Sequence, residues 1–295
     1  VVEIGTLPGL FEPLAGHVAR LRAGGVAVIG KAASVEEAVA YEHAGVDFVA
    51  IKGADGGGHI FGFTGTFSLL PQVVDAVGVP VINGGGVADG RGVAASFMLG
   101  AEAVEMGSRF LLANECPVHE NYKRAVLSAK EGETVVTGVI CGDAVRQLPN
   151  SLSERLLKVE RECDAEEAIS RIREMATDSL RKAAVDGDIQ EGCVTVGQIA
   201  GMLSKTQSAQ EIIDEIVADY TATLRTAPDF IGDRYYSRGL RGVGAILTIF
   251  ISITYCVGQT EGIVAGLVVA GEPVVPERGP PGAACPGAPP RCRDR

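Results

Sequence analysis

The sequence lacks the cysteine patterns of disulfide-rich and zinc-binding proteins. Its seven cysteines, at positions 116, 141, 163, 193, 256, 285 and 292, form no CxxC pair and show no zinc-ligand spacing. No basic stretch followed by an apolar segment begins the sequence, as an export signal would require. We therefore expect reduced cysteines and a cytoplasmic protein.

The sequence is also poor in positive charge. It has 26 Lys+Arg against 37 Asp+Glu, which gives a net charge of −11. This balance argues against nucleic acid, and against an anionic membrane, as the main partner. Apolar residues make up 46% of the 295 residues, enough to form the core of one large barrel or of two ordinary domains.

Residues 226–295 lack lysine altogether and carry 8 of the 14 prolines. Within them, residues 242–260 form an uncharged run of 19 residues, just long enough to span a membrane. Its polar and glycine content weakens that interpretation. We favour an atypical, poorly folded extension over a buried or membrane-associated segment.

Two common phosphate-binding motifs are incomplete. Gly84-x-Gly86 is followed three residues later by Asp89, where the dinucleotide fingerprint needs glycine. Gly85 and Gly90 have the spacing of a P-loop, but Arg91 follows where that motif needs lysine. The sequence therefore indicates neither a dinucleotide fold nor a P-loop enzyme.

Residues 80–110, PVINGGGVADGRGVAASFMLGAEAVEMGSRF, do show a coherent pattern: strand, glycine turn, helix, strand, glycine turn. The first turn contains Gly84–Gly86 and the second contains Gly107 and Ser108. Parallel (β/α)8 barrels hold phosphate groups at two such successive strand ends, where glycine lets backbone N–H groups approach closely. The alternative is that these glycines merely turn the chain.

The rest of residues 1–113 has the rhythm of a parallel α/β fold. Strands are predicted at 1–5, 26–29, 48–52, 80–82 and 103–106, and helices at 10–22, 34–43, 69–77 and 88–100. Ser34 is predicted to cap the second helix, with Glu37 at the capping-box position. Residues 114–225 are predicted to be a mostly helical segment packed on the barrel, with helices at 119–130, 151–161, 165–185, 196–204 and 208–224 and a strand within 134–140.

His59 is the candidate catalytic residue. It follows the strand at 48–52 in the glycine-rich loop 53–65, a position on the catalytic face of a barrel. Its side chain suits proton transfer near neutral pH, although a histidine on a surface loop is the alternative. His17 and His43 lie in predicted helices and are expected to be exposed, and His119 could cap a helix or take part in function.

Several motifs together resemble one family. GADGGGH, the 80–110 stretch, NECPVHENYK, GDAVRQLPN and GCVTVGQIAGMLSK are similar to motifs of the FMN-dependent nitronate monooxygenases, formerly called 2-nitropropane dioxygenases. That family includes the FMN-dependent enoyl-ACP reductases. The resemblance covers about residues 1–225.

The resemblance implies a role for each matching residue. Gly85 and Gly86 match the paired glycines that bind the FMN phosphate, and Gly107 and Ser108 match a Gly-Thr pair that binds it too. His59 matches the active-site histidine of an EAGGH motif. Lys52 stands where the family often has Gln or Glu near the flavin; it could stabilise an anionic reduced flavin or substrate, or it could point to solvent.

The resemblance also implies a (β/α)8 TIM-barrel type of fold. Family members carry about three further βα units before the strand that matches residues 1–5, so we expect this chain to lack the first three or so units. Five parallel strands cannot close a barrel of this size, and we expect both sheet edges to be open.

The implied activity is oxidation of alkyl nitronates with O2, with FMN as cofactor. The main alternative is an enoyl-ACP reductase, in which NAD(P)H would be a co-substrate and an enoyl thioester the substrate. An alternative of another class is a non-enzymatic fragment or a phosphate-ligand binding module. A homodimer is left open by the sequence.

Overall fold

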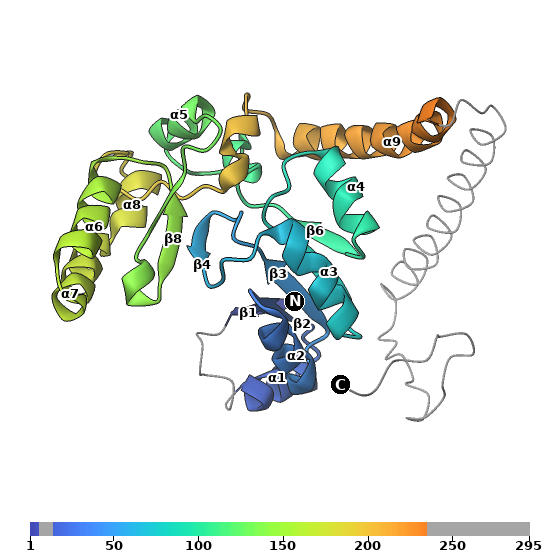
Figure 1. The fold of residues 1–295 in the computed structure, drawn as a ribbon, viewed down its shortest axis with the longest axis horizontal. Helices are drawn as coiled ribbons and strands as arrows, with labels where there is room; N and C mark the ends of the chain where they lie inside the picture. The colour runs from blue at the N-terminus through green and yellow to red at the C-terminus, as the bar shows by residue number, and fades with distance from the viewer. Residues whose placement is uncertain (6–13, 235–295) are drawn as a thin grey trace. The chain divides into compact units, whose positions relative to one another are not determined.

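The computed structural model describes residues 1–5 and 14–234, with side chains described as far as residue 224. The chain divides into two compact units, Val1–Leu224 and Arg225–Arg295. Every described strand lies in the first unit (Figure 1). The uncharged run at 242–260 lies outside the described residues, so the predictions about it stay predictions.

A five-stranded parallel sheet forms the first half of this unit. Its strands follow one another in space as they do along the chain, in the order β1 (Val2–Gly5), β2 (Val28–Ala32), β3 (Phe48–Lys52), β5 (Val81–Gly84), β6 (Ala103–Glu105). Sequential parallel order with intervening helices is the arrangement of a (β/α)8-type fold. The predicted fold class is thus confirmed, and within the described residues the sheet does not close into a barrel.

Four helices connect these strands: α1 (Leu14–Ala23), α2 (Val35–Ala44), α3 (Thr66–Ala76) and α4 (Gly90–Met98). Helix α2 contacts β2 and β3, α3 contacts β3 and β5, and α4 contacts β6. Their apolar side chains form one buried cluster with those of the strands, centred on residues such as Tyr41, Val49, Ile51 and Leu70. This layer fixes the strand ends that carry the glycine turns.

Strand β2 ends later than predicted, at Ala32 rather than residue 29. The cause is Gly30, which the sequence suggests as a strand end but which lies inside the strand, opposite Val49. A Cβ at Gly30 would lie 2.5 Å from Cδ1 of Tyr41, whose ring is fully buried against the strand. Glycine here makes room for an aromatic ring and does not end the strand.

The predicted cap of α2 is present, with one difference. The Ser34 hydroxyl accepts a hydrogen bond from the Glu37 backbone N–H at 3.1 Å. The Glu37 carboxylate, however, accepts from the Ala33 N–H at 2.6 Å and not from that of Ser34. Both contacts satisfy backbone donors at the start of the helix.

A second sheet was not predicted. Strand β4 (Gly58–Ile60) lies within the glycine-rich loop, and it pairs antiparallel with β8 (Ala144–Gln147), which pairs with β7 (Val135–Thr137). Figure 1 shows β4 between the parallel sheet and β8. Strand β7 lies within the strand predicted at 134–140. Strands β4 and β8, of three and four residues, give too little alternation to be read from sequence and were missed.

The remaining elements of the first unit are mainly helical. They are η1 (Phe110–Leu112), α5 (Glu120–Ser128), η2 (Val139–Cys141), α6 (Ser151–Glu162), α7 (Ala165–Ala176), α8 (Ser179–Ala184), η3 (Gln198–Met202) and the start of α9 (Ala209–Arg234). The single helix predicted over 165–185 is wrong. Asp178 has φ 57°, a left-handed conformation that ends α7 and begins α8. The helix predicted at 196–204 is the short 3-10 helix η3.

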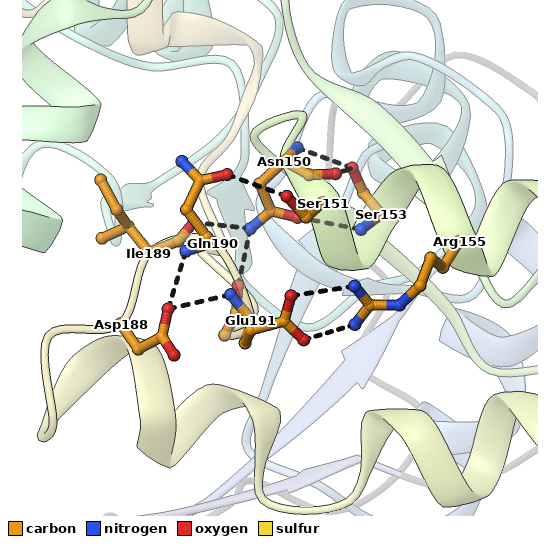
Figure 2. Close-up of polar contacts among 9 residues, drawn as sticks. Asn150, Ser151, Ser153, Arg155, Asp188, Ile189, Gln190 and Glu191 are labelled. Atoms are coloured by element: carbon orange, nitrogen blue, oxygen red, sulfur yellow. Dashed lines mark hydrogen bonds and ion pairs between the residues drawn. The ribbon is translucent and has the colours of Figure 1, made fainter.

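The start of α6 is tied to the loop at 188–192 (Figure 2). The Asn150 side chain accepts from the Ser153 N–H at 2.9 Å and donates to the carbonyls of Ile189 and Gly192 at 2.8 and 2.7 Å. Arg155 forms a two-pronged ion pair with Glu191, with N–O distances of 2.9 and 2.5 Å. This loop leads directly into residues 193–197, so these contacts position the segment that reaches the candidate site.

None of the helices in the described ranges combines the length and the apolar character needed to cross a membrane.

We expect Asn150→Ala to destabilise the first unit by about 2 to 4 kcal/mol, because it removes a helix cap, one buried hydrogen bond and one partly buried hydrogen bond. Chemical denaturation followed by circular dichroism would measure this change. Ser151→Ala is the matched control, because its hydroxyl makes only an exposed contact with Gln190 at 3.1 Å. Equal losses for the two variants would contradict the structural role of Asn150.

Candidate phosphate-binding site

Three parallel strands end in glycine turns at the same edge of the sheet. Gly53 follows β3, Gly84–Gly86 ends β5, and Gly107 lies two residues beyond β6. Gly85 and Gly86 have φ values of 91° and 73°, which side-chain-bearing residues rarely adopt. A Cβ at Gly84 would lie 2.6 Å from the Ile51 carbonyl oxygen. Close strand packing and left-handed backbone therefore both require glycine here.

These turns surround a cavity of about 210 Å³, which we call the inner cavity. It is lined by Lys31, Lys52, Asp55–Gly57, Gly84–Val87, Glu105–Ser108, Leu111, Thr195–Gly197 and Ile199. Five of the six residues predicted for the site are among them: Lys52, Gly85, Gly86, Gly107 and Ser108. The structure thus brings together residues from three separate strand ends.

Charged side chains line one part of the inner cavity. Lys31 Nζ lies 2.9 Å from a Glu3 oxygen and 2.6 Å from a Glu105 oxygen, so two carboxylates neutralise its charge. Lys52 has no ion pair within the part of the chain that the structure describes. Burial, and then the charge of Lys31, lowers the pKa of Lys52 from its ordinary value of 10.5. An anionic ligand would therefore find its cationic partner in Lys52.

Residues 195–197 contribute to the lining of the inner cavity from the second half of the unit. The Ser108 hydroxyl accepts a hydrogen bond from the Gly197 N–H at 2.8 Å, and the Asp55 carbonyl accepts from the Gln198 N–H at 2.9 Å. Thr195 is held in turn by Tyr122, whose hydroxyl donates to the Thr195 carbonyl at 2.6 Å. Burial raises the pKa of Tyr122 to about 12, so the hydroxyl remains a donor at neutral pH.

The sequence did not point to Thr195, Val196 or Gly197 as site residues. The one local signal is Gly197 itself, which follows a short apolar stretch much as the other turn glycines do. A Cβ at Gly197 would lie 2.8 Å from the Asp55 carbonyl oxygen. This requirement depends on a contact between residues far apart in the chain and cannot be read locally.

Two side chains hold the loop that follows β3. Asp55 accepts from the Thr66 N–H at 2.5 Å and so caps α3, whose own N-cap residue, Gly65, offers no side chain. Arg146, only 8% exposed, donates to the Ala54 carbonyl at 3.1 Å and to Thr134 at 3.0 Å. Burial lowers the pKa of Arg146, while the charge of Asp55 opposes that shift. The loop is thus fixed by the start of α3 on one side and by the second sheet on the other.

His59 does not line the inner cavity. It lies on β4, its side chain is 56% exposed, and its Nε2 is 3.3 Å from an Asp143 oxygen. Its ring is stacked on Phe61, with ring centroids 6.3 Å apart. Gly57, two residues earlier, does line the cavity. The structure therefore places His59 beside the loop of the site, and its catalytic role stays a prediction.

The other three histidines occupy the places expected. His17 and His43 are exposed on α1 and α2. His119 caps α5, since its Nδ1 accepts from the Asn121 N–H at 3.1 Å.

The inner cavity fits a phosphate-bearing cofactor. It presents glycine backbone that no side chain obstructs, the hydroxyl of Ser108 and the unpaired cation Lys52. The hydroxyl proton of Ser108 is available to a ligand, because its oxygen serves as acceptor for Gly197. An anion held here would meet donors from two strand ends and the ammonium group of Lys52, while the carboxylates of Asp55 and Glu105 also line the cavity.

Comparison with known proteins identifies one family. The family model for nitronate monooxygenase matches residues 9–219. A probable nitronate monooxygenase of Staphylococcus saprophyticus is 38% identical over 211 residues, which cover 68% of this chain and 58% of the relative. One of Staphylococcus haemolyticus is 35% identical over 210 residues, with the same coverage. The chain thus spans about 58% of the length of these curated relatives.

Two solved structures are similar as well. FabK from Thermotoga maritima has a TM-score of 0.71 and 37% identity, covering 78% of this chain and 70% of its own. A nitroalkane oxidase from Streptomyces ansochromogenes has a TM-score of 0.60 and 29% identity, covering 70% of this chain and 61% of its own.

The charge of Lys52 gives a prediction about pH. A lysine is cationic below its pKa, so affinity for inorganic phosphate should be full well below the lowered pKa of Lys52 and fall as pH rises through it. Below that pKa, Lys52→Gln should weaken binding about tenfold, and it should remove that component of the pH dependence. Isothermal titration would measure both effects. The exposed Lys182→Gln is the control, and an unchanged pH dependence in Lys52→Gln would exclude Lys52 as the anion's partner.

Proposed function

The chain belongs to the nitronate monooxygenase family, and on that premise we propose that it is an FMN-dependent oxidoreductase that oxidises alkyl nitronates with O2. The observation that carries the proposal is the gathering of Lys52, Gly85, Gly86, Gly107 and Ser108 around one cavity. These residues come from separate stretches of sequence. The resemblance matches Gly85, Gly86, Gly107 and Ser108 to residues that bind the FMN phosphate, and it places Lys52 near the flavin.

In this proposal the backbone at Gly85 and Gly86 and the hydroxyl of Ser108 hold the FMN phosphate. Glycine at these positions lets N–H groups point at the phosphate without a Cβ in the way. Bound FMN would supply the transfer of electrons from the substrate to O2. The protein contributes binding, orientation and charge.

Lys52 is the residue proposed to compensate the negative charge of a reduced flavin or of an anionic substrate. Its side chain lines the inner cavity, and its stem lies against Gly56, where a Cβ would be 3.1 Å from Lys52 Cε. The glycine therefore leaves room for the lysine to follow the cavity wall. Lys31 is less suited to this role, because Glu3 and Glu105 already neutralise it.

His59 is proposed to accept the α-proton of a nitroalkane or to donate a hydrogen bond to the nitronate oxygens. Asp143, 3.3 Å from Nε2, would stabilise the imidazolium formed when the ring takes a proton. The proposal requires the substrate to lie between the inner cavity and β4. In this proposal the glycine turns of the inner cavity hold the cofactor, and His59 on β4 supplies the base.

The enoyl-ACP reductase alternative involves the same site, and its co-substrate distinguishes it. In the absence of O2, NADH should leave the bound flavin oxidised if the nitronate proposal is correct, whereas an alkyl nitronate should bleach it. Rapid bleaching by NADH would favour the reductase. A purified protein with no flavin absorbance and no uptake of added FMN would favour a phosphate-ligand binding module.

We expect Gly86→Val to abolish FMN binding, because φ of 73° is strained for valine and a branched side chain would crowd Asp55 and Thr66, both within 3.6 Å of the Cβ position, and so displace the turn. Ser108→Ala should weaken FMN binding about fivefold, through the loss of one hydroxyl contact. Flavin absorbance after gel filtration, and fluorescence titration with FMN, would measure these effects.

Gly142→Val is the matched control for Gly86→Val. Gly142 has φ 67°, so the substitution brings similar backbone strain, but no atom lies within 4 Å of its Cβ position and it does not line the inner cavity. If both variants lost FMN equally, the loss would reflect a less stable protein. The assignment of Gly86 to the phosphate site would then be overturned.

We expect His59→Asn to keep FMN bound and to lower turnover of neutral nitroalkanes by about 10²- to 10⁴-fold. Turnover of preformed nitronates should fall less, because a nitronate has already lost its α-proton. Oxygen consumption with each substrate would measure the two effects, with His43→Asn as the control. Equal losses on both substrates would make His59 a binding group, and no loss on either would leave it a surface residue.

A further inference from the structure

Lys52 and a carboxylate, that of Glu105, lie on the same face of the parallel sheet, and both line the inner cavity. In the register of the sheet Lys52 lies opposite Gly84, and Gly84 lies opposite Glu105. Residues paired in this way point to the same face. Only a glycine therefore separates the two side chains, and a Cβ at Gly84 would lie 3.5 Å from Glu105 Oε2.

Glu105 is within reach of a lysine on β3. Neighbouring strands lie about 4.8 Å apart, so the backbones at Lys52 and Glu105 are about 10 Å apart, with β5 between them. Lys31 begins one strand further away, on β2, and its Nζ still contacts a Glu105 oxygen at 2.6 Å. A lysine on β3 is therefore long enough to make the same contact.

Lys31 prevents that contact. Its Nζ donates to both Glu105 oxygens, at 2.7 and 2.6 Å, and to a Glu3 oxygen at 2.9 Å. An ammonium group has three donors, and these contacts use all of them. The Lys31 side chain is only 16% exposed, which limits the screening of its charge by solvent. The carboxylate of Glu105 is thus directed to β2 and away from β3.

The other charged groups that face Lys52 do not replace Glu105 as a partner. Asp55 lines the cavity too, but its carboxylate accepts from the Thr66 N–H at 2.5 Å. Burial, and then the charge of Lys31, lowers the pKa of Lys52, while the charges of Glu105 and Glu3 oppose that shift. Lys31 therefore acts on Lys52 in two ways. It repels the ammonium group directly, and it holds the carboxylate that would otherwise attract that group.

We propose that Lys31 is a positioning residue that holds Glu105 away from Lys52 and so leaves Lys52 free for an anionic ligand. Without Lys31, Lys52 would pair with Glu105, and an anion would lose its cationic partner. The inference deepens the proposed function and rests on it, because it takes the inner cavity as an anion site. It makes Lys31 a determinant of the charge of the ligand, although Lys31 itself is neutralised.

Lys31→Met removes the charge and keeps an unbranched side chain. We expect it to weaken binding of inorganic phosphate to the full chain about tenfold, measured by isothermal titration below the pKa of Lys52. The pKa of Lys52 should rise, because the group loses a like charge and gains a carboxylate. NMR of ¹³C-labelled lysine would follow it, with Lys52→Gln to assign the signal. Lys31→Arg keeps the charge and should bind phosphate as the unchanged chain does.

Two double variants separate this mechanism from a simple loss of positive charge, since both restore the net charge of the unchanged chain. Lys31→Met with Glu105→Gln removes the carboxylate that would pair with Lys52. It should bring phosphate affinity back to within about threefold of the unchanged chain. Lys31→Met with Glu3→Gln leaves Glu105 free to pair, and it should bind as weakly as Lys31→Met alone.

Equal recovery in the two double variants would contradict the proposal, because net charge would then explain the loss. An unchanged pKa of Lys52, or unchanged phosphate binding, in a folded Lys31→Met would contradict it as well. If Lys31→Met does not fold, Lys31→Gln makes the same loss of charge and has the same expected results. Normal phosphate binding in Lys52→Gln would instead overturn the proposed function of Lys52, so the two failures are distinguishable.

Discussion

The site depends on backbone segments that approach more closely than any side chain would allow. A Cβ at Gly57 would lie 2.5 Å from the Gly197 nitrogen, and one at Gly53 would lie 2.6 Å from the Thr66 nitrogen. Contacts this short exclude every residue except glycine unless the backbone moves. They seat the loop after β3 between the start of α3 and residues 196–197, and the inner cavity exists because both contacts are made.

This packing links the parallel sheet to the second sheet. Arg146 on β8 donates to the Ala54 carbonyl, and β4, which continues the same loop, pairs with β8. Ser108, after the last parallel strand, accepts from Gly197 in the segment that follows the loop at 188–192. The inner cavity is therefore built at the junction of two sheets, and residues 114–224 belong to the site as much as the barrel strands do.

The sequence predicted what is local. The alternation of strands and helices, the Ser34 cap and the turns at Gly84–Gly86 and Gly107 each depend on residues close together in the chain. The contribution of Gly197 could not be predicted, because its contact with Ser108 joins residues 89 positions apart. The left-handed conformation of Asp178 was also hidden, since aspartate in the middle of a charged helical pattern gives no sign of a break.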